Sequence, residues 1–224
     1  MDSEYQEARE KILFATLPNV TFDGWVERTL KMGAESAGYT PDMAVRVFPD
    51  GARDVIRFWS NRDDRWMLDE MGKAERTALP FREKIIEAVR LRIDVNAPYR
   101  EAVRRTMSFL AMPQNAGLAT RNTFDAVSAI WYAIGDTSTD LDFYTKRLTL
   151  APIYVTTVLC WIDDTSEDSA ATWSFLDRRI DDAMVIPKLR ARFGDALSAL
   201  TSPFSMRPRR SRRNSRRRSA SRPL

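Results

Sequence analysis

The chain has 224 residues, 44% of them hydrophobic, which is enough to bury the core of one domain of generous size. The formal net charge of +4 is uneven: residues 207–224 hold nine arginines and no acid, so removing these nine charges leaves −5 for residues 1–206. There is no histidine, which excludes Ser-His-Asp and Cys-His catalytic systems, His-ligated zinc and the Glu-x-x-His motifs of di-iron bundles.

The first quarter of the sequence predicts three helices, the third of them short. A helix over 4–17 is expected to end at Pro18-Asn19, and a second over 21–38 places Phe22, Trp25 and Val26 on one face. A short helix over 41–48 begins at proline and is followed by an aromatic-Pro turn and a longer helix. This order resembles the N-terminal helix-turn-helix module of TetR-type regulators.

The rest of the body also reads as helix, with no convincing strand, so the predicted fold class is all-α. Helices are expected over 80–95, 98–112 and 115–134, and the end of the last is apolar around its circumference, as in a buried central helix. The uncharged stretch 148–162 is too short to span a bilayer and is expected to pack on all sides, in the bundle and across a subunit interface, bent at Pro152. A further helix over 167–185 carries one apolar stripe, formed by Trp173, Leu176, Ile180 and Met184.

Two terminal segments differ from this body. Residues 187–206 predict an amphipathic helix that binds the membrane interface through one apolar face, formed by Leu189, Phe193, Leu197, Leu200 and Phe204. Residues 207–224 predict a disordered Arg-rich tail, which is compatible with a solvated extension, a nucleic-acid tether or a tether to an anionic membrane surface. The predicted domains are therefore 1–50, a helix-turn-helix-like module, 51–186, a helical bundle, and these two segments.

The cellular location is predicted from the cysteine usage and the N-terminus. Cys160 is the only cysteine, so no disulfide can form within the chain. The acidic start Met1-Asp2-Ser3-Glu4-Tyr5 lacks the apolar region of a signal peptide and the arginines of a transit peptide. We therefore expect the bacterial cytoplasm, with peripheral attachment to the inner membrane.

Two motifs in the second half of the chain resemble a known family. The first runs from Asp136-Thr137-Ser138-Thr139-Asp140 through Phe143-Tyr144-Thr145-Lys146-Arg147 to Pro152-Ile153-Tyr154. The second is Asp164-Thr165-Ser166, followed by Thr172-Trp173-Ser174-Phe175-Leu176-Asp177-Arg178-Arg179. Their order and spacing are similar to the C-terminal signature of the coenzyme Q protein nine family.

The resemblance implies a TetR-like fold, a homodimer formed through the last two long helices, and a non-catalytic role without a cofactor or metal. It implies that the chain binds an isoprenoid or quinone lipid and presents ubiquinone precursors to the demethoxyubiquinone hydroxylase, a separate enzyme. The resemblance implies a lipid site formed by aromatic and neighbouring aliphatic residues of the buried helices. The expected lipid-binding residues are Trp131, Ile134, Leu148, Tyr154 and Trp161.

The resemblance also implies a partner-binding surface at the start of a helix, formed by Asp140, Phe143, Tyr144 and Arg147. The family more often has tryptophan at position 143, so an indole donor is lost there. From the residues alone, an equally good interpretation is a helix start that packs on its neighbours, with Asp140 as its cap.

Two other functions remain open. The first is a TetR-type transcriptional regulator with a lipid effector, but the short third helix offers only Asp42 and Arg46 as charged groups, so specific DNA binding is not expected. The second is an enzyme that uses two carboxylate pairs, Asp163 with Asp164 and Asp181 with Asp182, although such pairs more often cap or solvate helix ends.

Overall fold

The computed structural model describes residues 2–138 and 141–184, and the part up to Ala183 forms one compact unit. Within those residues the chain is helical, with no strand. The expected module 1–50 and most of the expected bundle 51–186 lie in this one unit. The predicted membrane helix 187–206 and the Arg-rich tail 207–224 lie outside the described residues.

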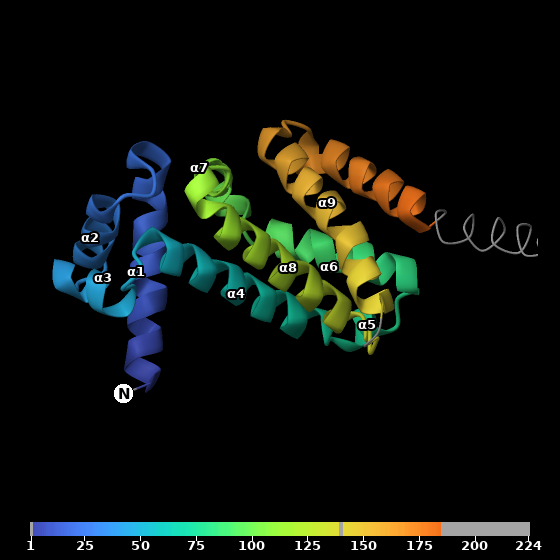
Figure 1. Cartoon of the computed structure of the whole chain (residues 1–224), viewed down its shortest axis with the longest axis horizontal. Helices are drawn as coiled ribbons and strands as arrows, with labels where there is room; N and C mark the ends of the chain where they lie inside the picture. Colours follow the sequence, from blue (N-terminus) through green and yellow to red (C-terminus); the bar gives the residue numbers. More distant parts are fainter. Residues whose placement is uncertain (1, 139–140, 185–224) are drawn as a thin grey trace, which may run out of the picture. The chain divides into compact units, whose positions relative to one another are not determined.

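The N-terminal part contains α1 (Asp2–Asp23), α2 (Glu27–Ser36) and α3 (Pro41–Val47), which pack on one another at one end of the bundle (Figure 1). The short third helix is confirmed, with Pro41 at its first turn. Helices α1 and α2 approach so closely at Gly33 that a Cβ on this residue would lie 2.0 Å from Thr16 Oγ1. Only glycine fits that crossing without a shift of the neighbouring helix.

The predicted end of the first helix at Pro18 is wrong, because α1 continues to Asp23. Proline removes one backbone hydrogen bond, but Leu17 and Val20, on either side of Pro18, are almost fully buried, and this packing offsets the loss. The second helix consequently begins at Glu27 and not near Thr21, and Phe22 is 82% exposed instead of facing inward.

The long helix α4 (Ala52–Met71) leads from this module into the bundle, as the sequence predicts. Trp25 joins the two parts, since its indole Nε1 donates to Thr106 Oγ1 at 2.9 Å and its ring lies 6.4 Å from that of Trp59. The module and the bundle therefore share a buried contact.

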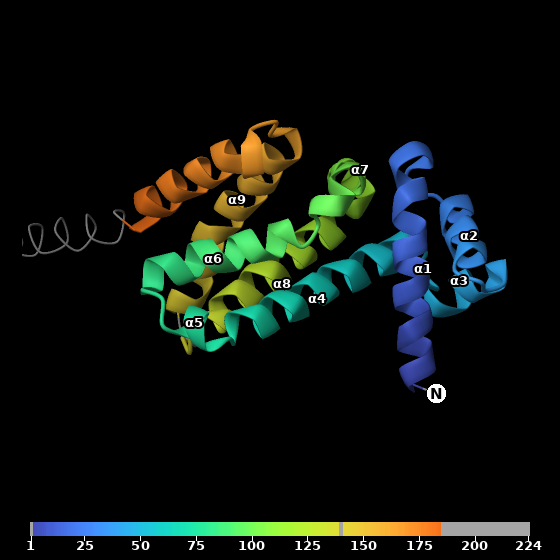
Figure 2. The ribbon, with the colours of Figure 1, turned by 180° about the vertical axis from the view of Figure 1, so that it is seen from behind.

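The bundle is completed by α5 (Ala74–Thr77), α6 (Phe81–Asp94), α7 (Arg100–Leu110), α8 (Ala116–Ala133) and α9 (Leu141–Asp163). Helices α4, α6 and α8 pack side by side, and α9 packs on α8 and α7 (Figures 1 and 2). Short 3-10 turns at Ala97–Tyr99, Pro113–Asn115 and Glu167–Ser169 separate the longer helices.

A last helix over residues 170–184 follows the third of these turns. Its start is fixed by Asp164, whose Oδ2 accepts hydrogen bonds from the backbone N–H of Thr172 at 2.8 Å and from the hydroxyl of Thr172 at 2.5 Å. Leu176 and Ile180 are buried along the predicted stripe.

One predicted burial pattern needs correction and a second stays open. The end of α8 is not buried all around, because Tyr132 is 73% exposed. Helix α9 continues through Pro152 and leaves Leu148 75% exposed within this chain, so its expected packing across a subunit interface stays a prediction. The sequence alone cannot separate a fully buried apolar helix from one that leaves an apolar face uncovered.

Candidate functional site

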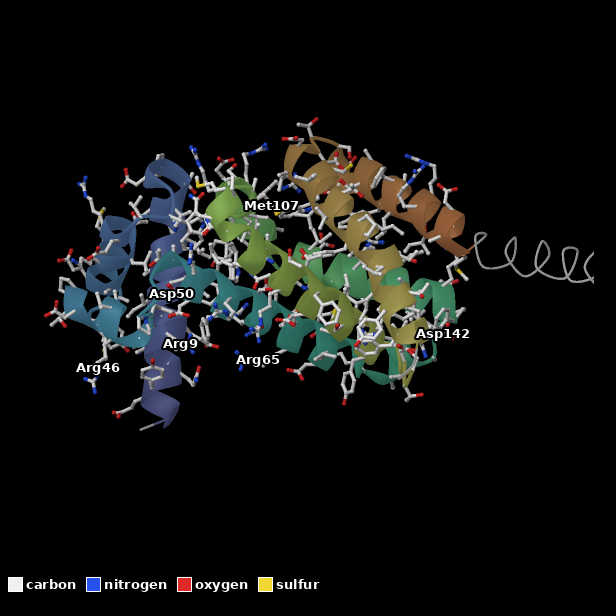
Figure 3. The ribbon with its side chains drawn as sticks, viewed as in Figure 1. Arg9, Arg46, Asp50, Arg65, Met107 and Asp142 are labelled. Atoms are coloured by element: carbon white, nitrogen blue, oxygen red, sulfur yellow. The ribbon has the colours of Figure 1, made fainter. Side chains whose placement is uncertain are left out.

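A cavity of about 610 Å³ lies among helices α4, α6, α7, α8 and α9. This volume is within the range of pockets that bind small molecules. Aliphatic and thioether side chains form much of its wall, among them Val103, Met107, Leu110, Val155, Val158 and Leu159. Figure 3 labels Met107 on α7. Such a wall accommodates an apolar chain.

One part of the cavity wall carries a buried polar network built on Arg92 of α6. Its Nε donates to Asp64 Oδ1 at 2.6 Å and its Nη2 donates to Ser60 Oγ at 2.8 Å. Its Nη1 donates to the hydroxyl of Tyr154 on α9. The side chains of Arg92 and Asp64 are 7% and 11% exposed, so this ion pair links α4, α6 and α9 away from solvent.

A second buried chain of hydrogen bonds begins at Trp59. Its Nε1 donates to Asn96 Oδ1 at 2.9 Å, and Asn96 Nδ2 donates to Asp63 Oδ2 at 2.7 Å. The other carboxylate oxygen, Asp63 Oδ1, accepts no hydrogen bond from any described residue. It lies 3.7 Å from Arg62 Nη1, which is too far for a hydrogen bond.

Burial changes the proton affinity of two groups on the cavity wall. It raises the pKa of Asp63 to about 6, against the opposing effects of Arg92 and of the hydrogen bond from Asn96. It also raises the pKa of Tyr154, so this hydroxyl keeps its proton near neutral pH. The wall therefore combines a carboxylate acceptor with a phenol.

Only part of the predicted lipid-binding set lines the cavity. Tyr154 and Trp161 do, whereas Trp131 and Ile134 are buried outside its wall and Leu148 is exposed. Trp131 instead packs 6.1 Å from the ring of Phe81. Helices α8 and α9 each present several faces, and sequence cannot tell which one meets a cavity.

The polar residues of the wall were missed, although a signal for them exists in the sequence. Ile56, Trp59, Asp63 and Met67 follow one another at steps of three and four, which puts a carboxylate on the inward face of α4. A charged group at such a position is almost never buried without a partner, and this pattern could have indicated the network.

The predicted partner-binding residues at the start of α9 divide into supporting and exposed groups. Arg147 is buried: its Nε donates to Ser128 Oγ at 2.9 Å, and its guanidinium carbon lies 3.3 Å from the centre of the Phe143 ring. Tyr144, 5.1 Å from that ring, is 58% exposed. Asp140 lies outside the described residues.

Asp136, in the loop before α9, contacts Lys146 and Arg147 of that helix. Burial alone would raise the pKa of Asp136, but hydrogen bonds from Lys146 at 2.6 Å and Ser138 at 2.7 Å outweigh it, and the pKa lies below its usual value. Asp136 therefore holds its negative charge 3.7 Å from Arg147 Nη1. The loop before α9 is tied to the helix by this cluster.

The paired carboxylates that sequence left open as catalytic groups contact cations and backbone donors. Asp163 pairs with Arg104, and Asp181 accepts from Arg82 at 2.6 Å. Asp164 caps the helix that follows it. Within the described ranges 2–138 and 141–184, no group of three or more metal-binding side chains comes together, and no helix is long and apolar enough to cross a membrane.

The fold places this chain in a class of all-helical proteins. It is similar to the crystal structure of a TetR transcriptional regulator from Nitrosomonas europaea, with a TM-score of 0.64 and 23% sequence identity over 79% of this chain and 97% of that one. The prediction of a TetR-like, all-α fold is confirmed.

Sequence comparison identifies the family within that class. Residues 116–187 match the family model described as COQ9. The ubiquinone biosynthesis protein COQ9 of Drosophila melanogaster is 33% identical over 183 residues, or 79% of this chain and 55% of that protein. The human protein of that name is 32% identical over 187 residues, or 80% of this chain and 58% of that protein.

The chain is similar to members of the COQ9 family over about four fifths of its length, and the predicted resemblance is confirmed. It spans less than two thirds of the length of these relatives. The predicted bacterial cytoplasmic location is wrong, because the relatives from Drosophila, human and Dictyostelium discoideum are all named as mitochondrial proteins of eukaryotes. The composition of an N-terminus is too weak a signal to decide a location.

Proposed function

We propose that this chain is a non-catalytic lipid-binding protein of ubiquinone biosynthesis, which holds an isoprenoid quinone precursor in its cavity and presents it to the demethoxyubiquinone hydroxylase. The names of the COQ9 relatives support the pathway. The observation that carries the proposal is the cavity of about 610 Å³, whose wall is largely apolar and includes residues of α8 and α9 within the COQ9 match.

The physical case for a lipid rests on apolar burial. Each methylene removed from water contributes about 0.8 kcal/mol, but a bilayer offers the same environment, so transfer from membrane to cavity is close to neutral. Such a carrier therefore extracts the lipid from the membrane at little net cost in free energy, and the partner enzyme carries out the reaction.

The partner surface is proposed at the start of α9. Tyr144 and Leu148 are one helical turn apart and 58% and 75% exposed, so they offer an uncovered apolar strip. Phe143 is half-buried, and the guanidinium of the buried Arg147 packs over its ring. We assign contact with the hydroxylase to Phe143 and Tyr144, and support of that contact to Arg147.

Two further partners belong to the same proposal. A homodimer formed through the last two long helices is supported by Leu159, an apolar residue that α9 also leaves exposed. An anionic membrane surface is supported only by the sequence of residues 187–224, which lies outside the described part of the chain.

A cavity-filling variant tests the function. Val158 lines the cavity, and Thr156 lies on the exposed side of the same helix. In vesicles that contain demethoxyubiquinone and the hydroxylase, Val158→Phe should lower the hydroxylation rate, because it takes up space that the lipid needs. Thr156→Phe is the matched control and should leave the rate unchanged. Equal rates for the two folded variants would contradict the proposal.

The rival function, a TetR-type regulator, is less well supported by the third helix. Its charged side chains Asp42 and Arg46 are exposed, and Arg46 points away from the ribbon (Figure 3). A single arginine gives too few donors to read a base sequence and bind the flanking phosphates.

A further inference from the structure

The ring of Phe143, at the start of α9, is held in place by a buried arginine. The guanidinium carbon of Arg147 lies 3.3 Å from the centre of this ring, so the planar guanidinium stacks on one of its faces. The ring of Tyr144 lies 5.1 Å away at an interplanar angle of 75°, and that of Phe124 on α8 lies 6.4 Å away. The orientation of the Phe143–Tyr144 pair therefore depends on where Arg147 lies.

Arg147 is fixed by two neutral oxygens and one charged group. Its Nε donates to Ser128 Oγ at 2.9 Å, and its Nη1 donates to the carbonyl oxygen of Phe143 at 3.0 Å. Neither oxygen balances the positive charge. That role belongs to Asp136, whose Oδ2 lies 3.7 Å from Arg147 Nη1, and no other acid among the residues that the structure describes forms an ion pair with Arg147.

This ion pair lies away from solvent, because the side chains of Arg147 and Asp136 are 7% and 6% exposed. Burial lowers the pKa of Arg147, and the nearby charge of Asp136 opposes this effect. A buried cation that loses its counterion is strongly destabilised. Loss of the Asp136 charge would therefore drive the guanidinium towards water and away from the ring of Phe143.

We propose that Asp136 is a positioning residue of the partner surface: its charge keeps Arg147 against Phe143, and Arg147 presents the Phe143–Tyr144 pair in the orientation that the partner binds. This inference rests on the proposed function, because it adds a residue to the surface proposed for the hydroxylase. Asp136 is buried and acts through Arg147, not by contact with the partner. Aromatic anchors that are held in place before binding lose less conformational freedom in the complex, which raises affinity.

A purely structural role of Asp136 predicts a different pattern. Asp136 also accepts hydrogen bonds from Lys146 Nζ at 2.6 Å and from Ser138 Oγ at 2.7 Å, and these bonds tie the loop before α9 to the helix. If Asp136 only anchored the loop, loss of one of these bonds would affect the partner surface as loss of the charge does. Ser138→Ala removes one bond and keeps the charge that faces Arg147, so it is the matched control.

A double-mutant cycle in binding titrations of the full-length protein with the hydroxylase tests this assignment. Asp136→Asn keeps the shape of the side chain and removes its charge, and we expect it to weaken binding about tenfold. Arg147→Met replaces the guanidinium by an apolar side chain that needs no counterion. In the Arg147→Met background, Asp136→Asn should have no further effect, because the two residues act as a unit. Ser138→Ala should bind as the parent protein does.

Salt dependence separates positioning from a direct effect of charge on the encounter with the partner. At 1 M salt, exposed charges interact over only about 3 Å, whereas a buried ion pair is screened much less. The loss caused by Asp136→Asn should therefore persist at 1 M salt. A loss that disappears at this salt concentration would overturn the positioning role.

The outcomes separate this inference from the function beneath it. Parent-like binding by Asp136→Asn, an equal loss in the Arg147→Met background, or an equal loss in Ser138→Ala would overturn the positioning role and leave the partner surface intact. If Asp136→Asn does not fold, the double variant still tests the role, because it has no unpaired buried charge and should bind as Arg147→Met does. Failure of the parent protein to bind the hydroxylase would overturn both this inference and the proposed partner.

Discussion

Replacing Asp63 by asparagine should change how stability depends on pH. Burial raises the pKa of Asp63 from 3.8 to about 6, so the folded protein binds a proton more tightly than the unfolded chain does. For such a group the stabilising effect is complete below the unfolded pKa and is lost as the pH rises through the folded pKa. At neutral pH the buried carboxylate is a cost to the fold.

The magnitude follows from the shift. At about 1.4 kcal/mol per pKa unit, the difference between 3.8 and about 6 corresponds to roughly 3 kcal/mol over the full window. Most other carboxylates are already ionised above pH 4.5. Of this stabilisation, about 2 kcal/mol is lost between pH 4.5 and pH 7.5. Asparagine has no proton to bind and keeps the hydrogen bond from Asn96 through its carbonyl, so this contribution vanishes in the variant.

Urea denaturation followed by tryptophan fluorescence measures the effect. The free energy of unfolding of Asp63→Asn minus that of the parent should be about 2 kcal/mol higher at pH 7.5 than at pH 4.5, because only the parent loses stability over this range. Asp69→Asn, exposed on the same helix, should show the same small difference at both values. Parallel pH profiles for the parent and Asp63→Asn would refute the reasoning.

Three other perturbations test separate parts of the structure. Tyr144→Ala should weaken the complex with the hydroxylase by about 2 kcal/mol in a binding titration, with an unchanged melting temperature because the side chain is 58% exposed; normal binding would refute the partner surface. Gly33→Ala should lower the free energy of unfolding by about 1–3 kcal/mol, since its Cβ meets Thr16, and an unchanged chemical-denaturation midpoint would show that α1 and α2 separate easily. In vesicle flotation, deletion of 187–224 should abolish binding to anionic vesicles and deletion of 207–224 should weaken it and reduce its salt dependence, whereas equal flotation of all forms would contradict the membrane role.

The sequence predicts those features of the fold that depend on local signals. Pro41 marks the short helix α3, and the apolar stripe through Leu176 and Ile180 gives the face of the last described helix. Pro18 misled the prediction because its local cost is offset by packing between helices, which a single stretch of sequence does not record.

The site was predicted less well, because a cavity depends on which faces of five helices meet. The resemblance indicated aromatic residues on α8 and α9, and of these Tyr154 and Trp161 lie on the wall while Trp131 does not. Asp64 and Arg92 are 28 positions apart in sequence, and only the packing of α4 on α6 brings this ion pair together. Their inward register was visible, but their partners were not.

The central claim is that the cavity holds a ubiquinone precursor, and extraction tests it most directly. The full-length protein, purified without detergent, is extracted with organic solvent, and the released lipids are identified by mass spectrometry. The account predicts an isoprenoid quinone precursor that is depleted in Val158→Phe and retained in Thr156→Phe. An empty extract from the parent protein, or equal lipid content in both variants, would contradict it.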